Sequence, residues 1–366
     1  MQTGTLISKI QKFMNQKLPP VQNTPSNDSL SVKRAIEAMF ADLERGRPEV
    51  QPSKYWIELN KSDRGQLLAT GFENFKRTVA KHYFTWTKIW PWDAQIRFLV
   101  SNIPLTSTIA NVFRTFVPIK HKHIPLHESL AYTFLSNMIW DYAAQNNPDI
   151  AKLSEPAIGN PPRIHRNGRL ISQDLANSSL EAQFILESLP KTLRLNRVCE
   201  LGAGYGRTAH VLLTLRPGIR YTIVDIPPAL YVSQQYLSKV YPNLKVFTWR
   251  PFKSYSEIKE EFESVDLAFL LPSQIEMLPD EIFDLFINIS SLHEMRMDQI
   301  RYFFSQIRRL TRRDGCFYLK EWKVSRIPFE NVIIRKEDYP FSEWRVLAER
   351  EVRVQTHFFE ALLQKP

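Results

Sequence analysis

The chain has 366 residues, of which 43% are apolar and 23% are charged, and this composition is that of a globular protein with a large core and room for more than one domain. No stretch approaches the roughly 20 apolar residues that span a bilayer, and the N-terminus MQTGTLISKIQKFMNQKLPP lacks the apolar run and cleavage site of an export signal. The net charge of +10 fits nucleic-acid binding, attraction of an anionic small molecule or a solvated basic surface, and alone it selects none of these.

Residues 1–150 are predicted to form an all-helical N-terminal region. A polar stretch, PPVQNTPSNDS, precedes a short helical pattern, VKRAIEAMFADLERG. In GFENFKRTVAKHYFTW, apolar residues recur every three or four positions and mark one buried helix face, and HESLAYTFLSNMIWDYAAQ follows the same pattern. We expect this region to cover a substrate or to form a homodimer.

Residues 151–366 are predicted to form an α/β domain. Residues 151–170 are rich in Pro, Gly and Asn and indicate a loop, after which a helix is expected over residues 172–189. The apolar runs RVCELGA, RYTIVDI, LAFLL, FDLFINI and CFYLKEW then alternate mostly with helical patterns, and two further strands close the chain. This order predicts a doubly wound, Rossmann-like sheet of seven strands, mostly parallel with an antiparallel last strand. Residues within 241–264 are interpreted as an insertion.

The strongest local signal is the segment RVCELGAGYGR, in which an apolar strand ends in Glu200 and runs into a glycine loop. Glycines let the backbone turn sharply and approach a ligand closely, because they carry no Cβ and tolerate positive φ. The spacing is GxGxG rather than the GxGxxG of dinucleotide folds, and an acid two residues earlier suits an ammonium group better than a pyrophosphate. The loop therefore predicts a site for S-adenosylmethionine (SAM), whose methionyl part carries such a group. We assign to it Glu200, Gly202, Ala203, Gly204, Gly206 and Arg207.

Three later positions complete the expected cofactor site. Asp225 ends the next strand, where a carboxylate can accept hydrogen bonds from both ribose hydroxyls, and Ile226 follows it. Gln274, in LLPSQIEMLPDEIFDLFINIS, lies where small-molecule methyltransferases usually carry an Asp that binds adenine, and its carbonyl oxygen can make the same bond. Asn288, after the fourth strand, is expected to line the pocket or to cap that strand.

From about Ser53 to the end, the chain resembles the bacterial sugar O-methyltransferase family of the class I SAM-dependent methyltransferases. The matching segments are SKYWIELN, GFENFKRTVAKHYFTW, ISQDLANSSLEAQFI, CELGAGYGR, YTIVDIPPALYVSQQYL, FDLFINISSLHEM and FYLKEW. The resemblance implies SAM as cofactor and methyl transfer to a hydroxyl, with a sugar of a glycan or a nucleotide sugar as acceptor.

A hydroxyl is a poor nucleophile, so a general base is expected beyond the ends of the strands, where ligands bind in open α/β sheets. His293, in NISSLHEM, is the best candidate, because histidine can be basic near neutral pH. The alternative is a buried histidine that orders the loop. Glu294 is expected to orient His293 or to contact the substrate.

The helix before the glycine loop presents further polar side chains. Gln173, Asn177 and Glu181 repeat every four residues and lie on one face, which is either a ligand contact or a solvated surface. Lys320, after the fifth strand, is assigned to the substrate with them, and its neighbour Glu321 either contacts substrate or pairs locally.

Several aromatic, histidine and cysteine residues receive no functional assignment. Tyr55, Trp56, Trp86, Trp90 and Trp92 could stack on sugars, but their helical spacing favours core packing. His121, His123 and His127 form a loose cluster without carboxylates at ligand spacing, so we assign no metal ligand, and metal dependence stays open. Cys199 and Cys316 lie in apolar runs, which indicates core positions in a reducing, cytoplasmic compartment.

Two other functions remain. A nucleic-acid methyltransferase would explain the basic charge, but the fourth strand is followed by Asn288-Ile-Ser-Ser and not by the (D/N)PPY motif of amino-methylating enzymes, so no nucleic-acid partner is expected. A non-catalytic module that retains the SAM-binding scaffold is the other alternative, and the complete acid-plus-glycine segment argues against it.

Overall fold

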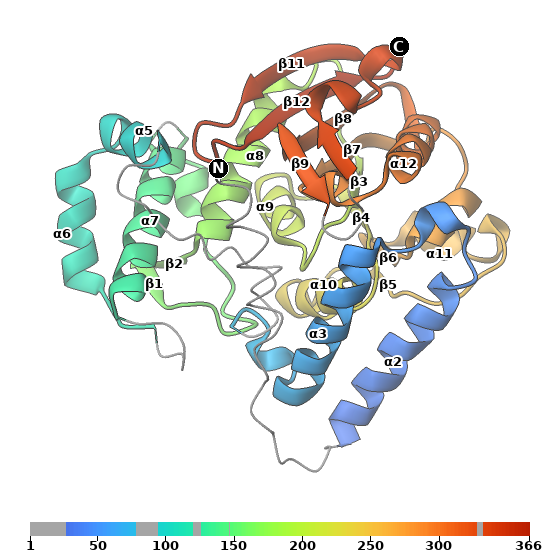
Figure 1. Cartoon of the computed structure of the whole chain (residues 1–366), viewed down its shortest axis with the longest axis horizontal. Coiled ribbons are helices and arrows are strands. Elements are labelled where there is room, and N and C mark those ends of the chain that lie inside the picture. Colours follow the sequence, from blue (N-terminus) through green and yellow to red (C-terminus); the bar gives the residue numbers. More distant parts are fainter. Residues whose placement is uncertain (1–26, 78–93, 120–125, 146, 328–331) are drawn as a thin grey trace.

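A mixed eight-stranded sheet forms the centre of the computed structural model, which describes residues 27–77, 94–119, 126–145, 147–327 and 332–366 (Figure 1). The strand order is β11-β12-β8-β7-β3-β4-β6-β5. The six strands from β5 to β8 in this order run parallel, whereas β12 is antiparallel to both β8 and β11. The strands are β3 (Arg197–Leu201), β4 (Arg220–Val224), β5 (Val246–Phe247), β6 (Leu267–Leu270), β7 (Phe283–Ile289), β8 (Thr311–Trp322), β11 (Arg345–Glu351) and β12 (Phe358–Gln364).

The doubly wound, mostly parallel sheet is as predicted, but the expected number of seven strands is wrong. The additional strand is β5, which pairs with β6 at the edge of the sheet and comes from the stretch interpreted as an insertion. Two residues are too few to produce a recognisable alternation of apolar and polar side chains. Two hairpins lie outside this sheet, formed by β1 (Ile164–Arg166) with β2 (Arg169–Ile171) and by β9 (Val324–Ile327) with β10 (Val332–Arg335).

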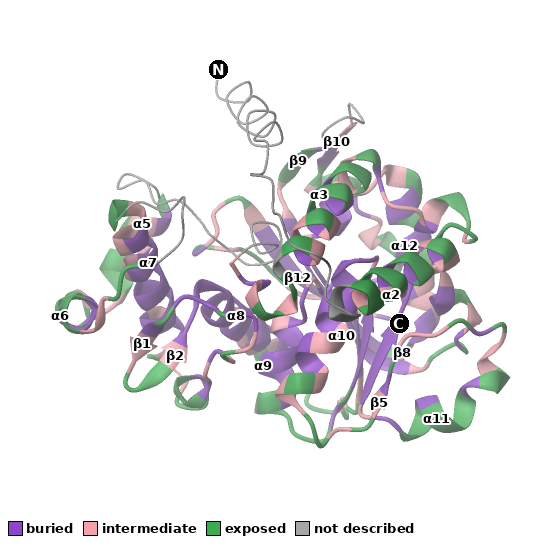
Figure 2. Ribbon diagram, turned by 90° about the horizontal axis from the view of Figure 1, so that it is seen from below, coloured by how far each residue is buried: buried purple, intermediate pink, exposed green. Residues whose placement is uncertain are grey.

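Helices cover both faces of the sheet. Figure 2 shows α8, α9 and α10 on one side and α12 on the other, with their buried faces turned toward the strands. These helices are α8 (Gln173–Ser188), α9 (Arg207–Leu215), α10 (Ala229–Val240), α11 (Lys259–Ser264) and α12 (Met297–Leu310). The Ser172 side chain begins α8 by accepting the Leu175 N–H at 2.9 Å, as an N-cap residue does.

The described part of residues 1–150 is helical, as expected, but its helices form two groups rather than one (Figure 1). The first group, α5, α6 and α7, lies beside α8, and the second, α2 and α3, lies on the other side of the molecule. The turn after α3 contacts α10 through the Lys239–Glu73 ion pair. The bounds are α2 (Asn27–Leu43), α3 (Lys54–Thr70), α5 (Ala94–Asn102), α6 (Leu105–Thr115) and α7 (Leu126–Ala144). Of the predicted helix at 72–86, the described part begins with a 3₁₀ turn at Phe72–Asn74, and positions 78–86 lie outside the described residues.

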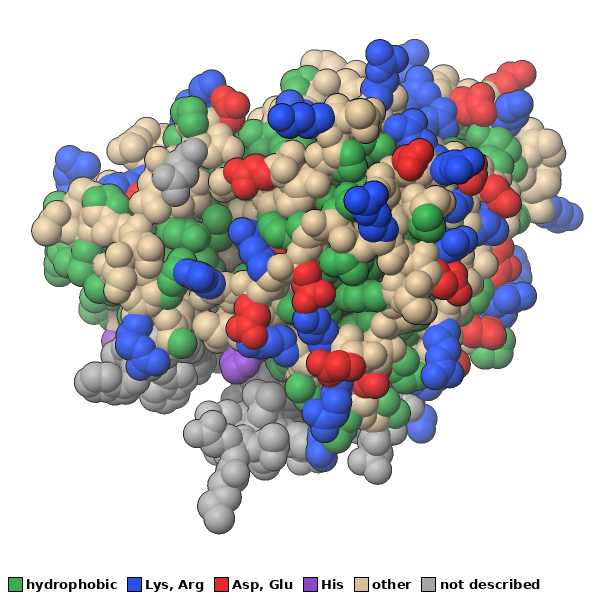
Figure 3. Space-filling view, turned by 90° about the horizontal axis from the view of Figure 1, so that it is seen from above, with side chains coloured by type: hydrophobic (Ala, Val, Ile, Leu, Met, Phe, Trp, Pro, Cys, Tyr) green, Lys and Arg blue, Asp and Glu red, His purple; other side chains and the backbone are tan. Residues whose placement is uncertain are grey.

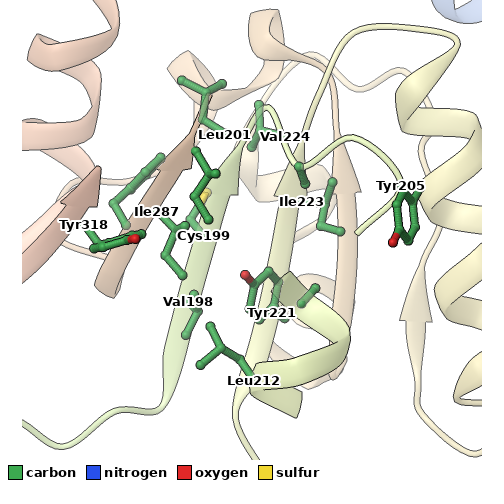
Figure 4. Close-up of a cluster of buried hydrophobic side chains, with 14 of the residues drawn as sticks. Val198, Cys199, Leu201, Tyr205, Leu212, Tyr221, Ile223, Val224, Ile287 and Tyr318 are labelled. Atoms are coloured by element: carbon green, nitrogen blue, oxygen red, sulfur yellow. The ribbon is translucent and has the colours of Figure 1, made fainter. Parts of the chain in front are cut away.

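The core is built from strands that are apolar on both faces. Every residue of β7 is buried, and β3 and β4 are buried except at their first residues, as is typical of parallel strands covered on both sides. Figure 4 shows Val198, Cys199 and Leu201 of β3 packed beside Ile223 and Val224 of β4. This core fixes the carboxyl ends of the central strands side by side, and the functional residues follow those ends.

A buried ion pair joins the N-terminal region to the α/β domain. The Lys76 ammonium is fully buried against the Glu155 carboxylate, whose other oxygen accepts the Ser172 hydroxyl at 2.6 Å. Burial lowers the pKa of Lys76, although Glu155 opposes this effect. Removing one partner of such a pair leaves an uncompensated buried charge.

We therefore expect Lys76→Met to lower the free energy of unfolding by about 3–5 kcal/mol, measured by urea denaturation. The matched control is Lys239→Met, which breaks the exposed Lys239–Glu73 pair (2.9 Å) and should cost less than about 1 kcal/mol. Equal losses in the two variants would contradict the importance of the buried pair.

Candidate functional site

A cavity of about 510 Å³ lies at the carboxyl ends of β3, β4, β7 and β8. Its walls combine the loops that follow these strands with a segment from the N-terminal region that includes the start of α3. Its size is that of a typical small-molecule site. The residues at or after the strand ends include Leu201, Gly202, Ala203, Gly204, Arg207, Asp225, Ile226, Pro272, Ser290, Ser291, His293, Glu294, Lys320 and Trp322. Those from the N-terminal segment include Gln51, Ser53, Tyr55, Trp56 and Leu59.

The glycine loop after β3 forms one wall of the cavity. Gly202 has φ +73°, and a Cβ at this position would lie 2.3 Å from the Ser291 hydroxyl oxygen. Gly206, at φ +88°, is the N-cap of α9 and lies behind the cavity lining. The Gly204 N–H donates to the Asp225 carboxylate at 2.8 Å, which ties the loop to the end of β4. The predicted loop residues Gly202, Ala203, Gly204 and Arg207 thus line one cavity.

Asp225 follows β4 and faces the same cavity, together with Ile226. Besides the Gly204 bond, its second oxygen accepts the Ile226 N–H at 2.7 Å. Burial raises the pKa of this carboxyl to about 7. Each carboxylate oxygen retains a free lone pair, so the side chain can still accept hydrogen bonds from a ligand.

Glu200 and Asn288 lie behind this wall and are not part of the lining. The Glu200 carboxyl accepts the Tyr221 hydroxyl at 2.7 Å, and burial raises its pKa to about 8. Asn288 donates through Nδ2 to the Leu201 carbonyl at 2.9 Å and to the Ser291 hydroxyl at 2.6 Å. Both side chains therefore hold strand ends and the glycine loop in place.

Gln274 is also outside the cavity lining, although Pro272 of the same turn is part of it. Its carbonyl oxygen, the atom expected to bind adenine, accepts the Leu271 N–H at 2.9 Å. Its amide donates to the Arg250 carbonyl at 2.8 Å. In this arrangement the side chain caps the turn after β6.

Three charged side chains of the cavity lining, Arg207, Glu181 and Lys320, are bonded to one another. Arg207 donates to one Glu181 oxygen at 2.6 Å, and Lys320 donates to the other at 2.7 Å and also to Gln355. Burial raises the pKa of Glu181, but the two cations outweigh it and the net shift is downward. The three groups together carry one net positive charge. Of the other substrate candidates, Asn177 lines a neighbouring cavity and Gln173 lines neither.

His293 lines the cavity and forms a hydrogen-bonded pair with Glu321, which is not part of the lining. Glu321, fully buried at the end of β8, accepts His293 Nδ1–H at 2.5 Å and the backbone N–H groups of Ser291 and Leu292 at 3.1 and 3.0 Å. Burial lowers the pKa of His293, but the carboxylates of Glu321 and Glu294 outweigh it and raise the pKa above its ordinary value. The sequence marked Glu321 only as a residue at the ligand edge.

Aromatic rings surround this pair. Trp322 stacks on the His293 ring at a centroid distance of 5.1 Å, and Trp56 donates its indole N–H to Glu294 at 2.8 Å. Tyr55 and Trp56 are half-buried and line the cavity, and Tyr55 also packs against the hydrophobic core, as its spacing favoured. Positions 86, 90, 92, 121 and 123 of the other aromatic and histidine candidates lie outside the described residues.

No group of three or more His, Cys, Asp or Glu side chains among the described residues is arranged to hold a metal ion. No described helix is long and apolar enough to cross a membrane.

No family model matches the sequence, and no curated protein matches it. Among solved structures, a SAM-dependent methyltransferase from Leishmania major is similar over 52% of this chain and 72% of its own, with 16% identity and a TM-score of 0.38. A SAM-dependent methyltransferase from Aquifex aeolicus is similar over 50% and 89%, with 13% identity and a TM-score of 0.34. A geranyl diphosphate methyltransferase in complex with GPP and sinefungin is similar over 51% and 79%, with 10% identity and a TM-score of 0.36. At identities and TM-scores this low, the likenesses carry no argument about function, which has to come from the cavity itself.

Proposed function

We propose that this protein is a SAM-dependent O-methyltransferase that acts on a hydroxyl of a small molecule or glycan. One observation carries the proposal: a single cavity is lined by a glycine loop, by the carboxylate of Asp225 that is bonded to this loop, and by His293, which is bonded to the buried Glu321. The glycine loop and Asp225 suit an adenosine-linked ligand, and the His293–Glu321 pair suits removal of a proton from a hydroxyl.

The residues present fit SAM. Gly202 and Gly204 bring backbone to the cavity without side chains, and Asp225 offers carboxylate lone pairs to ribose hydroxyls. Arg207 and Lys320, on either side of Glu181, give the cavity the net positive charge that a methionyl carboxylate requires. When bound, SAM supplies a methyl group activated by its sulfonium. The assignments of Glu200, Gln274 and Asn288 as direct contacts stay predictions.

His293 is placed to act as the base. Because Nδ1 donates to the Glu321 carboxylate, the hydrogen-bond network assigns the proton of the neutral ring to Nδ1 and leaves a lone pair on Nε2. Nε2 can then take the proton of an acceptor hydroxyl, and Glu321 stabilises the resulting imidazolium. Glu294, held by the Trp56 indole, offers a second acceptor that orients the substrate.

A sugar is the acceptor we favour within this class. The half of the cavity near His293 combines the aromatic side chains Tyr55, Trp56 and Trp322 with the Glu294 carboxylate, and flat rings beside hydrogen-bonding groups suit a pyranose. The resemblance to sugar O-methyltransferases supports the same choice. A nucleic-acid acceptor is the alternative that the charge of +10 favours. On the face in Figure 3, however, Lys and Arg side chains are interspersed with Asp and Glu.

Two experiments test the proposal. Calorimetric titration with SAM should give a dissociation constant in the micromolar range, and absence of binding would remove both the enzyme and the SAM-binding module. Incubation with methyl-labelled SAM and a panel of sugars, nucleotide sugars and glycan extracts should then label at least one acceptor. Labelling of RNA or DNA instead would favour the nucleic-acid alternative.

The affinity for SAM is expected to depend on pH through Asp225. With its pKa raised to about 7, this carboxyl is mostly protonated at pH 6 and mostly ionised at pH 8, and the ionised form is the better acceptor for ribose hydroxyls. Affinity should therefore rise about tenfold from pH 6 to pH 8, as measured by calorimetry. Asp225→Asn should bind SAM more weakly and lose this pH dependence. A variant that kept the same dependence would assign it to another group.

A further inference from the structure

A second cavity of about 580 Å³ adjoins the first. Its walls come from α7, α8 and the connection between β11 and β12, and they include Tyr142, Asn177 and Arg353. Glu181 and Lys320 line both cavities, so the two meet at this buried ion pair. A ligand that reaches past Lys320 would therefore enter the second cavity.

Asn177 points to a ligand in this second cavity. Its side chain is only 3% exposed and forms part of the cavity lining, so its amide is open to a ligand in the cavity and to little else. It lies one helical turn before Glu181 on α8, on the same face. An amide in a cavity wall offers both a donor and an acceptor, which a ligand hydroxyl can bond to.

The charges of the second cavity indicate a neutral ligand. Most of its acids are already paired, since Glu181 bonds to Lys320 at 2.7 Å and Glu360 bonds to Arg350 at 2.7 Å. Its lining contains four acids and three bases, so it holds no excess positive charge to attract a phosphate. The uncharged polar groups of the lining are the Asn177 amide and the Tyr142 hydroxyl, while the Gln183 amide donates to Glu187 at 2.8 Å.

We propose that the second cavity binds an additional neutral sugar unit of the acceptor, while the unit to be methylated lies beside His293. This inference rests on the proposed function and narrows it, because it makes the acceptor an oligosaccharide or glycan rather than a free monosaccharide or a nucleotide sugar. Asn177 is then a residue that sets acceptor length and takes no part in the chemistry.

A glycan array of neutral mono-, di- and trisaccharides, probed with the protein in the presence of SAM, tests this proposal. The wild type should bind at least one di- or trisaccharide about tenfold more tightly than the corresponding monosaccharide. Asn177→Leu, which keeps the volume but removes the amide, should abolish this gain. Tyr142→Phe removes a single hydroxyl from the opposite wall and should reduce the gain with little risk to folding.

SAM titration of each variant separates this inference from the proposed function. Because Asn177 and Tyr142 do not line the first cavity, both variants should keep wild-type SAM affinity. If SAM fails to bind even to the wild type, the proposed function fails. If SAM binds but no neutral saccharide does, or if a longer saccharide binds no more tightly than the monosaccharide, the second subsite is overturned. It is also overturned if both variants still bind the longer saccharide more tightly than the monosaccharide.

Discussion

Replacing His293 with alanine is expected to lower kcat for methyl transfer about 10²–10⁴-fold while SAM affinity stays within about twofold of wild type. Nothing else in the described cavity combines a free imidazole nitrogen with a buried carboxylate that compensates the charge it gains. The measurement is transfer of label from SAM to the acceptor identified by the panel, with SAM affinity followed by calorimetry. A kcat within about threefold of wild type would show that His293 is not the base.

Glu321→Gln is the companion variant, because it keeps a side chain of similar shape and removes the charge. Glu321 raises the pKa of His293, and a base works only in its neutral form, so wild-type turnover should rise with pH through a pKa above the ordinary value of histidine. In Glu321→Gln the pKa of His293 falls, and the rise in turnover should move to lower pH. A profile that does not move would limit Glu321 to a structural role in ordering the loop.

The sequence predicted those features of the site that are encoded locally. The repeated glycines predict a loop with positive φ, and Gly202 and Gly204 have it. Asp225 and His293 each follow a recognisable apolar strand. Parallel strands bring their carboxyl ends to one edge of the sheet, so the sequence predicts that these residues lie together. The same reasoning does not distinguish side chains that face the cavity from those behind its lining, such as Glu200 and Gln274, which the structure places outside the lining.

What the sequence could not predict depends on contacts between distant segments. The Trp56 indole donates a hydrogen bond to Glu294, which lies 238 positions later in the sequence, and no periodicity within either segment predicts this contact. Likewise, Asn177 and Glu181 share a helix face, but only the packing of α8 against the end of β8 divides that face between two cavities. The eighth strand was missed for a different reason, since β5 is held by its pairing with β6 rather than by a pattern of its own.

Gly202→Ala is expected to weaken SAM binding about 100-fold in calorimetry, the largest effect we predict for a single methyl group. The residue has φ +73°, which costs an alanine about 1–2 kcal/mol. In addition, the new Cβ would lie 2.3 Å from the Ser291 hydroxyl oxygen, and that hydroxyl is held by Asn288 at 2.6 Å. The loop must therefore shift as a unit, away from the position in which it lines the cavity.

Gly218→Ala separates the two causes. Gly218 has φ +91°, so an alanine there suffers similar backbone strain, but a Cβ would meet no atom within 4 Å, and the residue lies at the other end of α9. Gly218→Ala should lose about as much stability as the backbone strain costs Gly202→Ala, and it should keep wild-type SAM affinity. If Gly202→Ala bound SAM as tightly as Gly218→Ala does, the close approach of the loop to Ser291 would be irrelevant to the ligand. The proposal that this loop forms the cofactor site would then lose its main structural support.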